Sequence, residues 1–160
     1  MSVENEQLLL NEDVYIEDTM RHRYLTFELD SEEYAVEIAY VREIVNMKPI
    51  TRIPDTPDYV EGIINVRGDI APVIDIRKRF LKPSRPADES ASIIIFVEYK
   101  DYYLGLVADA VIEVLTIESE FIVPPPSAKL NYHNQFVKSI GKVGTKVKQI
   151  LDLDRLLAQE

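Results

Sequence analysis

Two apolar runs joined by a two-residue turn lie in the middle of this 160-residue chain. The runs cover residues 63–67 and 70–76, and the Gly68-Asp69 pair between them is typical of a tight β-hairpin. In the second run Ile70, Ile74 and Ile76 alternate with Ala71, Val73 and Asp75, which predicts a strand with one buried face. Pro72 cannot donate a ladder hydrogen bond, so we expect an edge or a bulge there.

Other segments have the same strand-like character. Residues 24–29 and 34–38 flank a polar turn and predict another hairpin. Ile38, Val41 and Val45 follow at i, i+3 and i+7, which predicts a short helix through Asn46. After a polar, proline-containing connection at residues 83–90, the apolar runs resume in the second half. They lie at residues 93–97, 102–107, 111–115, 135–140 and 147–153.

A loose internal repeat relates the two halves. Phe27 and Tyr34 find counterparts in Phe96 and Tyr103, and Val41-Arg42-Glu43-Ile44 in Val111-Ile112-Glu113-Val114. Ile74-Asp75-Ile76 then recurs as Leu151-Asp152-Leu153. About ten short strands with few helices predict a mainly β chain of two small barrels. We place the first lobe roughly at residues 22–82 and the second roughly at 91–158. Sequence order does not fix strand partners, so the lobes can exchange strands.

The charge distribution argues against nucleic-acid binding. The net charge is -10, and residues 1–20 contain six acidic side chains and no Lys or Arg. The remaining body has 22 acidic against 18 basic residues, and an acidic surface repels phosphate backbones. Residues 1–21 are expected to form a flexible acidic tail. Its Leu8-Leu9-Leu10 run, followed by Val14 and Ile16, is only weakly amphipathic, which favours a frayed tail over a partner-binding helix.

Several functional classes are disfavoured by what the sequence lacks. It has no cysteine, and its longest apolar runs fall short of the roughly 20 residues that span a bilayer. The acidic N-terminus also lacks the basic flank of a signal peptide, so we expect a cytoplasmic protein without direct membrane insertion. His22 and His133 lie far apart in polar surroundings, and no phosphate-binding loop occurs, so we expect no metal and no cofactor.

Two carboxylates are the best candidates for acid–base chemistry. Asp75 and Asp152 each lie between two apolar residues. Their period-two position favours a hydrogen-bonded strand carboxylate, and a small enzyme using Asp75 or Asp152 is the less favoured alternative. For binding, Glu43 lies among apolar residues and Arg67 at the end of the central strand. We hypothesise that the two side chains meet beside a groove and pair or contact a partner.

The central motif also resembles a known family. Asn65-Val66-Arg67-Gly68, followed by residues 72–77 and closed by Phe80, is similar to the signature of the CheW family of bacterial chemotaxis adaptors. The resemblance extends from about Tyr24 to Leu157 and identifies residues 22–158 as a CheW-like domain. It implies two SH3-like five-stranded β-barrels with a few short helices. Because the chain ends soon afterwards, we expect no appended receiver domain and no kinase core.

The resemblance implies a role without catalysis. CheW-like proteins are scaffolds that couple the cytoplasmic tips of methyl-accepting chemoreceptors to the regulatory domain of the histidine kinase CheA. We therefore expect no enzyme activity, a protein that is monomeric alone, and recruitment to membrane-associated receptor arrays. A CheW-like adaptor of a non-flagellar pathway, controlling pilus motility or gene expression, is an open alternative.

The resemblance also nominates partner-binding residues. Val41, Glu43, Ile44 and Arg67 occupy positions of the family pattern associated with function. Leu104 and Val111, apolar in the second lobe, are weaker candidates for the same groove. Gly62 and the turn residue Gly68 are expected to have structural roles.

Overall fold

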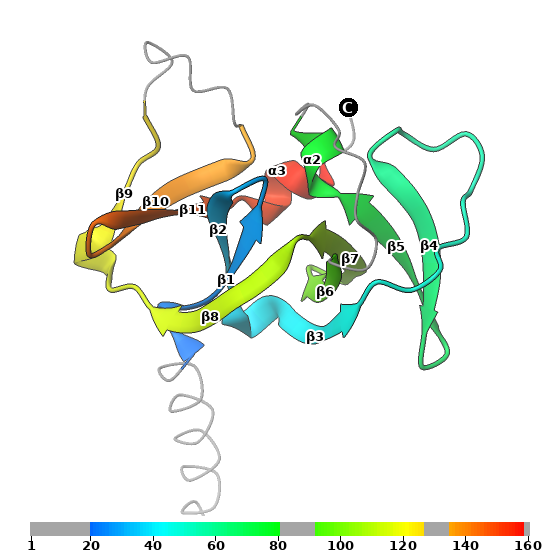
Figure 1. Cartoon of the computed structure of the whole chain (residues 1–160), viewed down its shortest axis with the longest axis horizontal. Coiled ribbons are helices and arrows are strands. Elements are labelled where there is room, and N and C mark those ends of the chain that lie inside the picture. The colour runs from blue at the N-terminus through cyan, green and yellow to red at the C-terminus, as the bar shows by residue number, and fades with distance from the viewer. Residues whose placement is uncertain (1–19, 81–91, 127–134, 159–160) are drawn as a thin grey trace, which may run out of the picture.

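The computed structural model describes residues 20–80, 92–126 and 135–158, and they form a mainly β fold (Figure 1). The predicted tail, residues 1–21, lies outside the described residues except for Met20 and Arg21. The strands are β1 (Arg23–Leu29), β2 (Glu32–Glu37), β3 (Val41–Asn46), β4 (Val60–Val66), β5 (Asp69–Asp75), β6 (Ile93–Tyr99), β7 (Tyr102–Ala108), β8 (Ala110–Thr116), β9 (Ile122–Val123), β10 (Val137–Val143) and β11 (Lys146–Leu151). The helices are short: η1 (Ile38–Tyr40), α2 (Ile76–Arg79), η2 (Ser119–Phe121) and α3 (Leu153–Leu157).

The strands form two sheets, and each sheet takes strands from both halves of the chain. One sheet has the order β8-β1-β2-β11-β10-β9 and the other β3-β6-β7-β5-β4. The first hairpin of each half, β1–β2 or β6–β7, therefore lies in the sheet built mainly from the other half. Parallel pairings of β2 with β11 and of β5 with β7 join each hairpin to its host sheet. The predicted mainly β fold is confirmed, with the two-residue β9 as a sixth strand in one sheet.

The internal repeat corresponds to equivalent packing in the two halves. Phe27 stacks on Tyr34 across β1 and β2, with ring centroids 6.0 Å apart. Phe96 stacks in the same way on Tyr103 across β6 and β7, at 5.7 Å. The third repeated segment ends a strand and starts a helix in both halves, at the junctions of β5 with α2 and β11 with α3. The repeated aromatic and aspartate positions therefore have repeated structural roles.

The short helix predicted through Asn46 is wrong, because only Ile38–Tyr40 form a single 3₁₀ turn. Residues Val41–Asn46 form strand β3, which pairs with β6 at one edge of its sheet. Apolar residues at i, i+3 and i+7 are also compatible with a bulged strand, and this strand has a register shift between Val41 and Glu43. The β-branched residues of β3 complete the sheet, a contact with residues about fifty positions away that local spacing does not predict.

Strand β5 also differs in part from expectation. Ala71 and Val73 are buried, whereas Ile70 is 58% exposed, so the isoleucine series does not form one continuous buried face. Ile74 becomes buried where β5 enters the sheet between β4 and β7. Pro72 lies one residue before the pairing with β7 begins, so at this point β5 is bonded to β4 alone. The expected edge position of Pro72 is therefore confirmed.

The main core lies between the two sheets. Leu25 and Phe27 of one sheet pack there with Ile95 and Val97 of the other. A smaller cluster around Phe96 fills the barrel of β3–β7, and another around Ile150 fills the opposite barrel. None of the described helices is long and apolar enough to cross a membrane. The edge strands β3 and β8 both border the core between the sheets, and both have apolar side chains exposed to solvent.

Candidate functional site

Glu43 and Arg67 are brought together from separate elements of one sheet. Glu43 lies on β3 opposite Phe96 of β6. Arg67 occupies the first position of the β4–β5 turn, with φ of 54°, and Gly68 follows with φ of 91°. Both values are typical of a tight hairpin turn, and Asn65 accepts a hydrogen bond from the Gly68 amide at 2.9 Å. This turn holds the Arg67 backbone in place and directs its side chain toward β3.

The two side chains form an ion pair, as hypothesised from the sequence. The distance from Arg67 Nη2 to Glu43 Oε1 is 3.0 Å, and the side chains are 82% and 24% exposed, respectively. An exposed pair of this kind contributes at most about 1 kcal/mol to folding. The arginine head is therefore fixed in direction yet open to solvent. Such a group can serve recognition without being essential to stability.

The ion pair borders an open pocket of about 570 Å³ at the mouth of the β3–β7 barrel. A second pair in the pocket wall, Arg42 with Glu98, has an N–O distance of 3.0 Å. Tyr103 lies in the same wall, where burial and then the nearby Glu43 raise the pKa of its hydroxyl. The residues lining the pocket are Arg42, Glu43, Val66, Arg67, Asp69, Ile70, Glu98 and Tyr103. Two arginines and three carboxylates in one wall suit a polar partner with both signs of charge.

An apolar strip adjoins this pocket on the other face of β3. Directly paired residues share a face of a sheet. Val41 and Ile44 pair with Val97 and Ile95, which belong to the core between the sheets. Val111 and Val114 of β8 likewise pair with Phe27 and Leu25 of that core. We call these four side chains, Val41, Ile44, Val111 and Val114, the inter-sheet strip.

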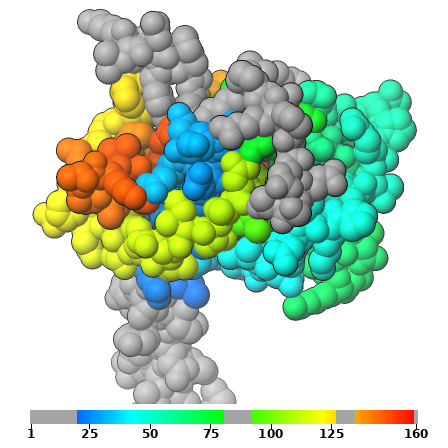
Figure 2. All heavy atoms as spheres, in the orientation of Figure 1, coloured from blue at the N-terminus to red at the C-terminus, as the bar shows by residue number. Residues whose placement is uncertain are grey.

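The inter-sheet strip is unusually open for apolar residues at a core boundary. Ile44 is 42% exposed, Val111 38% and Val114 43%. Figure 2 shows the surfaces of β8, in yellow-green, and β3, in cyan, adjoining on one side of the molecule. The strip contains segments that the sequence repeat relates, because Val41 and Ile44 correspond to Val111 and Val114. The repeat therefore contained the signal for Val114, which the sequence analysis did not single out.

The remaining nominated residues have different positions. Leu104 pairs with Val97 and is only 1% exposed, so it supports the strip from within the core and is not part of the surface. Gly62 has φ of 148°, and a Cβ there would lie 2.1 Å from the Thr51 carbonyl oxygen. Gly68 needs its positive φ, but a Cβ there would meet nothing within 4 Å. Only the first glycine is required by close packing.

Asp75 and Asp152 have structural roles in helix capping. The Asp75 carboxylate accepts hydrogen bonds from the backbone amides of Arg77 and Lys78 at the start of α2. The Asp152 carboxylate accepts one from the Arg155 amide at the start of α3. Burial raises the pKa of Asp75, and the two backbone hydrogen bonds act in the opposite direction. N-capping explains why both halves carry aspartate at this position.

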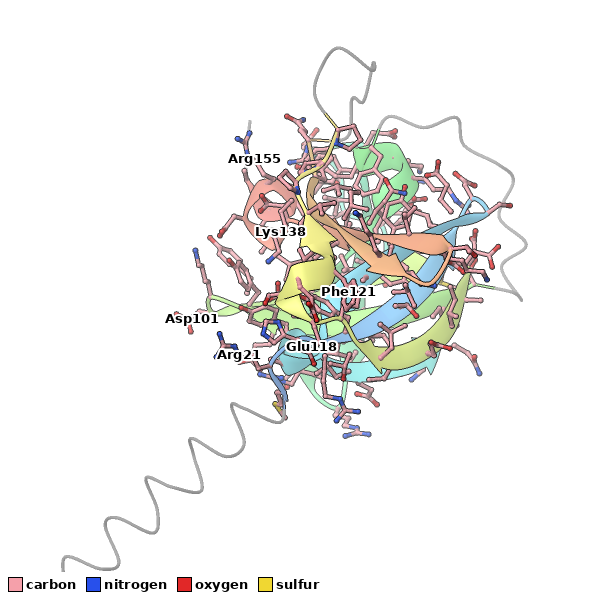
Figure 3. The ribbon with its side chains drawn as sticks, turned by 90° about the vertical axis from the view of Figure 1, so that its left-hand side faces the viewer. Arg21, Asp101, Glu118, Phe121, Lys138 and Arg155 are labelled. Carbon is pink, nitrogen blue, oxygen red and sulfur yellow. The ribbon has the colours of Figure 1, made fainter. Side chains whose placement is uncertain are left out.

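A second cluster of charged and aromatic groups lies around Tyr40 and Tyr99, which are close in sequence to the Arg42–Glu98 pair of the pocket wall. Lys138 of β10 forms an ion pair with Glu37, and Tyr40 contacts Tyr99 edge-on at 4.9 Å. Figure 3 shows Lys138 between the levels of Arg155 and Phe121 on this side. Burial is the largest cause of the raised pKa of Tyr40, followed by Glu37. Within the described ranges, no group of three or more His, Cys, Asp or Glu side chains could hold a metal ion, and His133 lies outside those ranges.

Comparison with known proteins agrees with this arrangement. The family model described as CheW-like domain matches residues 23–160. The chain is 32% identical over 143 residues to the chemotaxis protein CheW of Klebsiella aerogenes, covering 89% of this chain and 86% of the relative. It is 32% identical over 138 residues to CheW of Thermotoga maritima, covering 84% and 87%.

A solved structure gives the same result in three dimensions. The scaffolding protein TtCheW from Thermoanaerobacter tengcongensis superposes with a TM-score of 0.77 at 39% sequence identity. The match covers 87% of this chain and 94% of that one. Together with the central hairpin motif, these matches establish that the chain belongs to the CheW family of chemotaxis scaffold proteins.

Proposed function

We propose that this chain is a non-catalytic scaffold that couples the cytoplasmic tips of methyl-accepting chemoreceptors to the regulatory domain of the histidine kinase CheA. It works in the cytoplasm and is recruited to membrane-associated receptor arrays. Family membership supports the scaffold role. The observation that carries the receptor-binding assignment is the Glu43–Arg67 pair beside the open inter-sheet strip.

The receptor site combines apolar and charged contacts. A receptor tip is a helical hairpin, and an amphipathic helix places its apolar side chains against an apolar surface. Val41, Ile44, Val111 and Val114 supply that surface, and Leu104 keeps it rigid from below. Glu43 lies on the opposite face of β3, and Arg67 lies in the β4–β5 turn. This pair contacts charged residues of the same partner and so fixes the position of the partner along the strip. Gly62 and Gly68 hold the strand and turn that present Arg67.

The absence of catalysis is part of the proposal. The two aspartates that the sequence left as candidate catalysts are occupied as N-caps of α2 and α3. A carboxylate held by backbone amides at a helix start has a structural task that accounts for its position. The assignment to receptor coupling, in place of another CheW-like pathway, rests on the chemotaxis relatives.

Calorimetric titration of a soluble receptor-tip fragment with the full chain tests the receptor site. Glu43→Ala and Arg67→Ala are each expected to weaken binding about ten-fold, because each leaves a charged group without its partner at the contact. The matched control is Lys100→Ala, which breaks an exposed ion pair with Asp154. The N–O distance of that pair is 2.8 Å, against 3.0 Å for Arg67 and Glu43, and neither of its residues lines the pocket. Unchanged affinity of both variants, with the fold intact, would contradict the assignment.

A further inference from the structure

The described part of the chain begins close to one end of the inter-sheet strip. Arg23 of β1 pairs with Thr116, the last residue of β8. The His22 carbonyl accepts a hydrogen bond from the Ile117 amide at 2.8 Å. Figure 3 shows Arg21 close to Glu118, just after the end of β8. Met20, to which residues 1–19 are attached, is therefore close in sequence to residues at the C-terminal end of the strand that carries Val111 and Val114.

The tail has the composition to cover such a strip. Leu8-Leu9-Leu10, Val14 and Ile16 give it five large apolar side chains. Its six acidic residues come with no Lys or Arg. Exposed Arg21 and Arg23 lie near the Val114 end of the strip, and β8 contains a single acidic residue, Glu113. Apolar and charge complementarity therefore point to the same surface.

The tail is also long enough. An extended chain spans at most about 3.3–3.6 Å per residue. Counted back from Met20, Ile16 can lie up to about 14 Å away and Leu8 up to about 43 Å. The seven-residue strand β8 is about 23 Å long at 3.3 Å per residue. The apolar part of the tail can therefore reach every position along the strip without any change in the fold.

We propose that residues 8–16 dock on the inter-sheet strip of the same chain and compete with the receptor helix for it. This inference rests on the proposed function for its consequence, because it makes the tail a built-in regulator of receptor binding. The sequence alone favours a frayed tail, and the exposed strip next to its attachment point supplies the missing binding surface. A short flexible linker gives an effective concentration of about 1 mM, so an intrinsic dissociation constant of about 0.2 mM keeps the tail docked about 80% of the time.

The test of docking uses the absence of native cysteine. Gln7→Cys in the full chain carries a nitroxide label, and the paramagnetic broadening of the Ile44, Val111 and Val114 methyl signals is measured. Docking predicts strong broadening that Leu8→Glu, Leu9→Glu and Leu10→Glu together remove. The matched control, Ser2→Glu, Asn5→Glu and Asn11→Glu, adds the same three charges but keeps the leucines, and should retain the broadening. Broadening that is weak, or insensitive to the leucine changes, overturns the proposal.

A mixed sample identifies the occupant. Nitroxide-labelled chain without isotope is combined with isotope-labelled chain without nitroxide. Docking within one chain predicts no broadening in this sample, whereas broadening would show that the tail of a second copy occupies the strip, and would overturn the proposal.

Receptor binding then tests the regulatory consequence. The triple leucine variant is expected to bind the receptor-tip fragment about five-fold more tightly than the unaltered chain, because about one fifth of the unaltered molecules are open. Unchanged affinity despite docking overturns the competition. If the tail docks but neither the unaltered chain nor the triple leucine variant binds the receptor fragment, the proposed function is refuted instead. The two failures are therefore distinguishable.

Discussion

Individual side chains in this fold divide into those that stabilise it and those that remain available to a partner. Asp75 belongs to the first group, since its carboxylate accepts two backbone hydrogen bonds at the start of α2. Glu43 and Arg67 belong to the second, because the Arg67 side chain is 82% exposed and Glu43 holds it at the rim of the open pocket. The two kinds of carboxylate look alike in the sequence, where each is flanked by apolar residues. Only their contacts in the folded structure distinguish the two roles: backbone amides at Asp75 and an exposed arginine at Glu43.

The Asp75 cap gives a stability prediction with a defined pH dependence. Asp75→Ala should lower the free energy of unfolding by about 1 kcal/mol, the usual cost of losing an N-cap. Asp75→Asn keeps the accepting oxygen and should cost less. Asp152→Ala offers a comparison at the equivalent start of α3, where the carboxylate accepts one hydrogen bond.

The pH dependence follows from the raised pKa of Asp75. A native state with the higher pKa holds the proton more tightly than the unfolded chain, so stability is lost as the pH rises from the ordinary value of 3.8 through the folded-state value. Asp75→Asn lacks this loss. Urea unfolding should therefore show the asparagine variant gaining stability relative to the unaltered chain as the pH rises through that window. A relative gain by the unaltered chain would contradict the stated effect of burial.

A glycine pair separates close packing from backbone conformation. Gly62→Ala places a methyl group against the Thr51 carbonyl and should cost about 3 kcal/mol or more, since backbone must move. Gly68→Ala meets no atoms and should cost about 1 kcal/mol for its positive φ alone. Thermal unfolding of the two variants gives the comparison. Equal costs would mean that the approach of β4 to residue 51 is not tight.

At the scale of elements, one buried arginine connects helix α2 to two turns. Arg77 of α2 forms an ion pair with Asp30 in the β1–β2 turn at 3.1 Å and another with Asp109 in the β7–β8 turn. Its side chain is only 10% exposed. Arg79, two residues later, donates hydrogen bonds to the carbonyls of Leu156 and Ala158 at the end of α3. The short helix α2 therefore connects both sheets although it packs few apolar residues itself.

Removing the Arg77 charge should destabilise the molecule strongly. Arg77→Met leaves two partly buried carboxylates without their cation and is expected to cost about 3–5 kcal/mol in urea unfolding. Arg42→Met, which removes the exposed partner of Glu98, should cost no more than about 1 kcal/mol. Adding Asp30→Asn and Asp109→Asn to the Arg77 variant should recover part of the loss. Similar costs for the two arginine variants would contradict a structural role for the buried pairs.

Element types were predictable where one local pattern dominated, and not where two patterns fitted. The central hairpin followed from Gly68-Asp69 between apolar runs, and β4–β5 has that turn. Strand β3 was mistaken for a helix because a short apolar run fits both periods, and its pairing with β6 is a long-range contact. Leu104 was nominated as an apolar residue of the groove, but its side chain is buried, and its strand β7 lies between β6 and β5. The predicted proximity of Glu43 and Arg67 is confirmed by their ion pair. It could be predicted because the family likeness and the local chemistry pointed to the same two residues.

For the whole molecule, exchange of the first hairpins makes the two halves mutually dependent. Strands β1 and β2 complete the sheet of β8–β11, and β6 and β7 complete that of β3–β5. The repeat predicted two equivalent halves, but strand partners depend on long-range pairing that a single sequence does not reveal. Because of this exchange, neither half of the chain contains all the strands of one sheet.

This exchange predicts one cooperative unfolding transition. The chain has no tryptophan, so Tyr102→Trp on β7 and Val147→Trp on β11 place one fluorescent probe in each sheet at an exposed position. The two single variants should report coincident urea midpoints and slopes, in agreement with circular dichroism. Transitions that differ between the two probes would contradict interdependence of the sheets.

A coupling scaffold must bind the receptor and the kinase at the same time. The most direct measurement immobilises a receptor-tip fragment and passes the CheA regulatory domain over it with and without this chain. We expect retention of the kinase domain only when the chain is present, because a coupling scaffold must bind both partners at once. Retention should be reduced with Glu43→Ala, which weakens the proposed receptor site. If the receptor fragment and the kinase domain instead displace each other from the chain, or if retention does not depend on the chain, the coupling function is wrong.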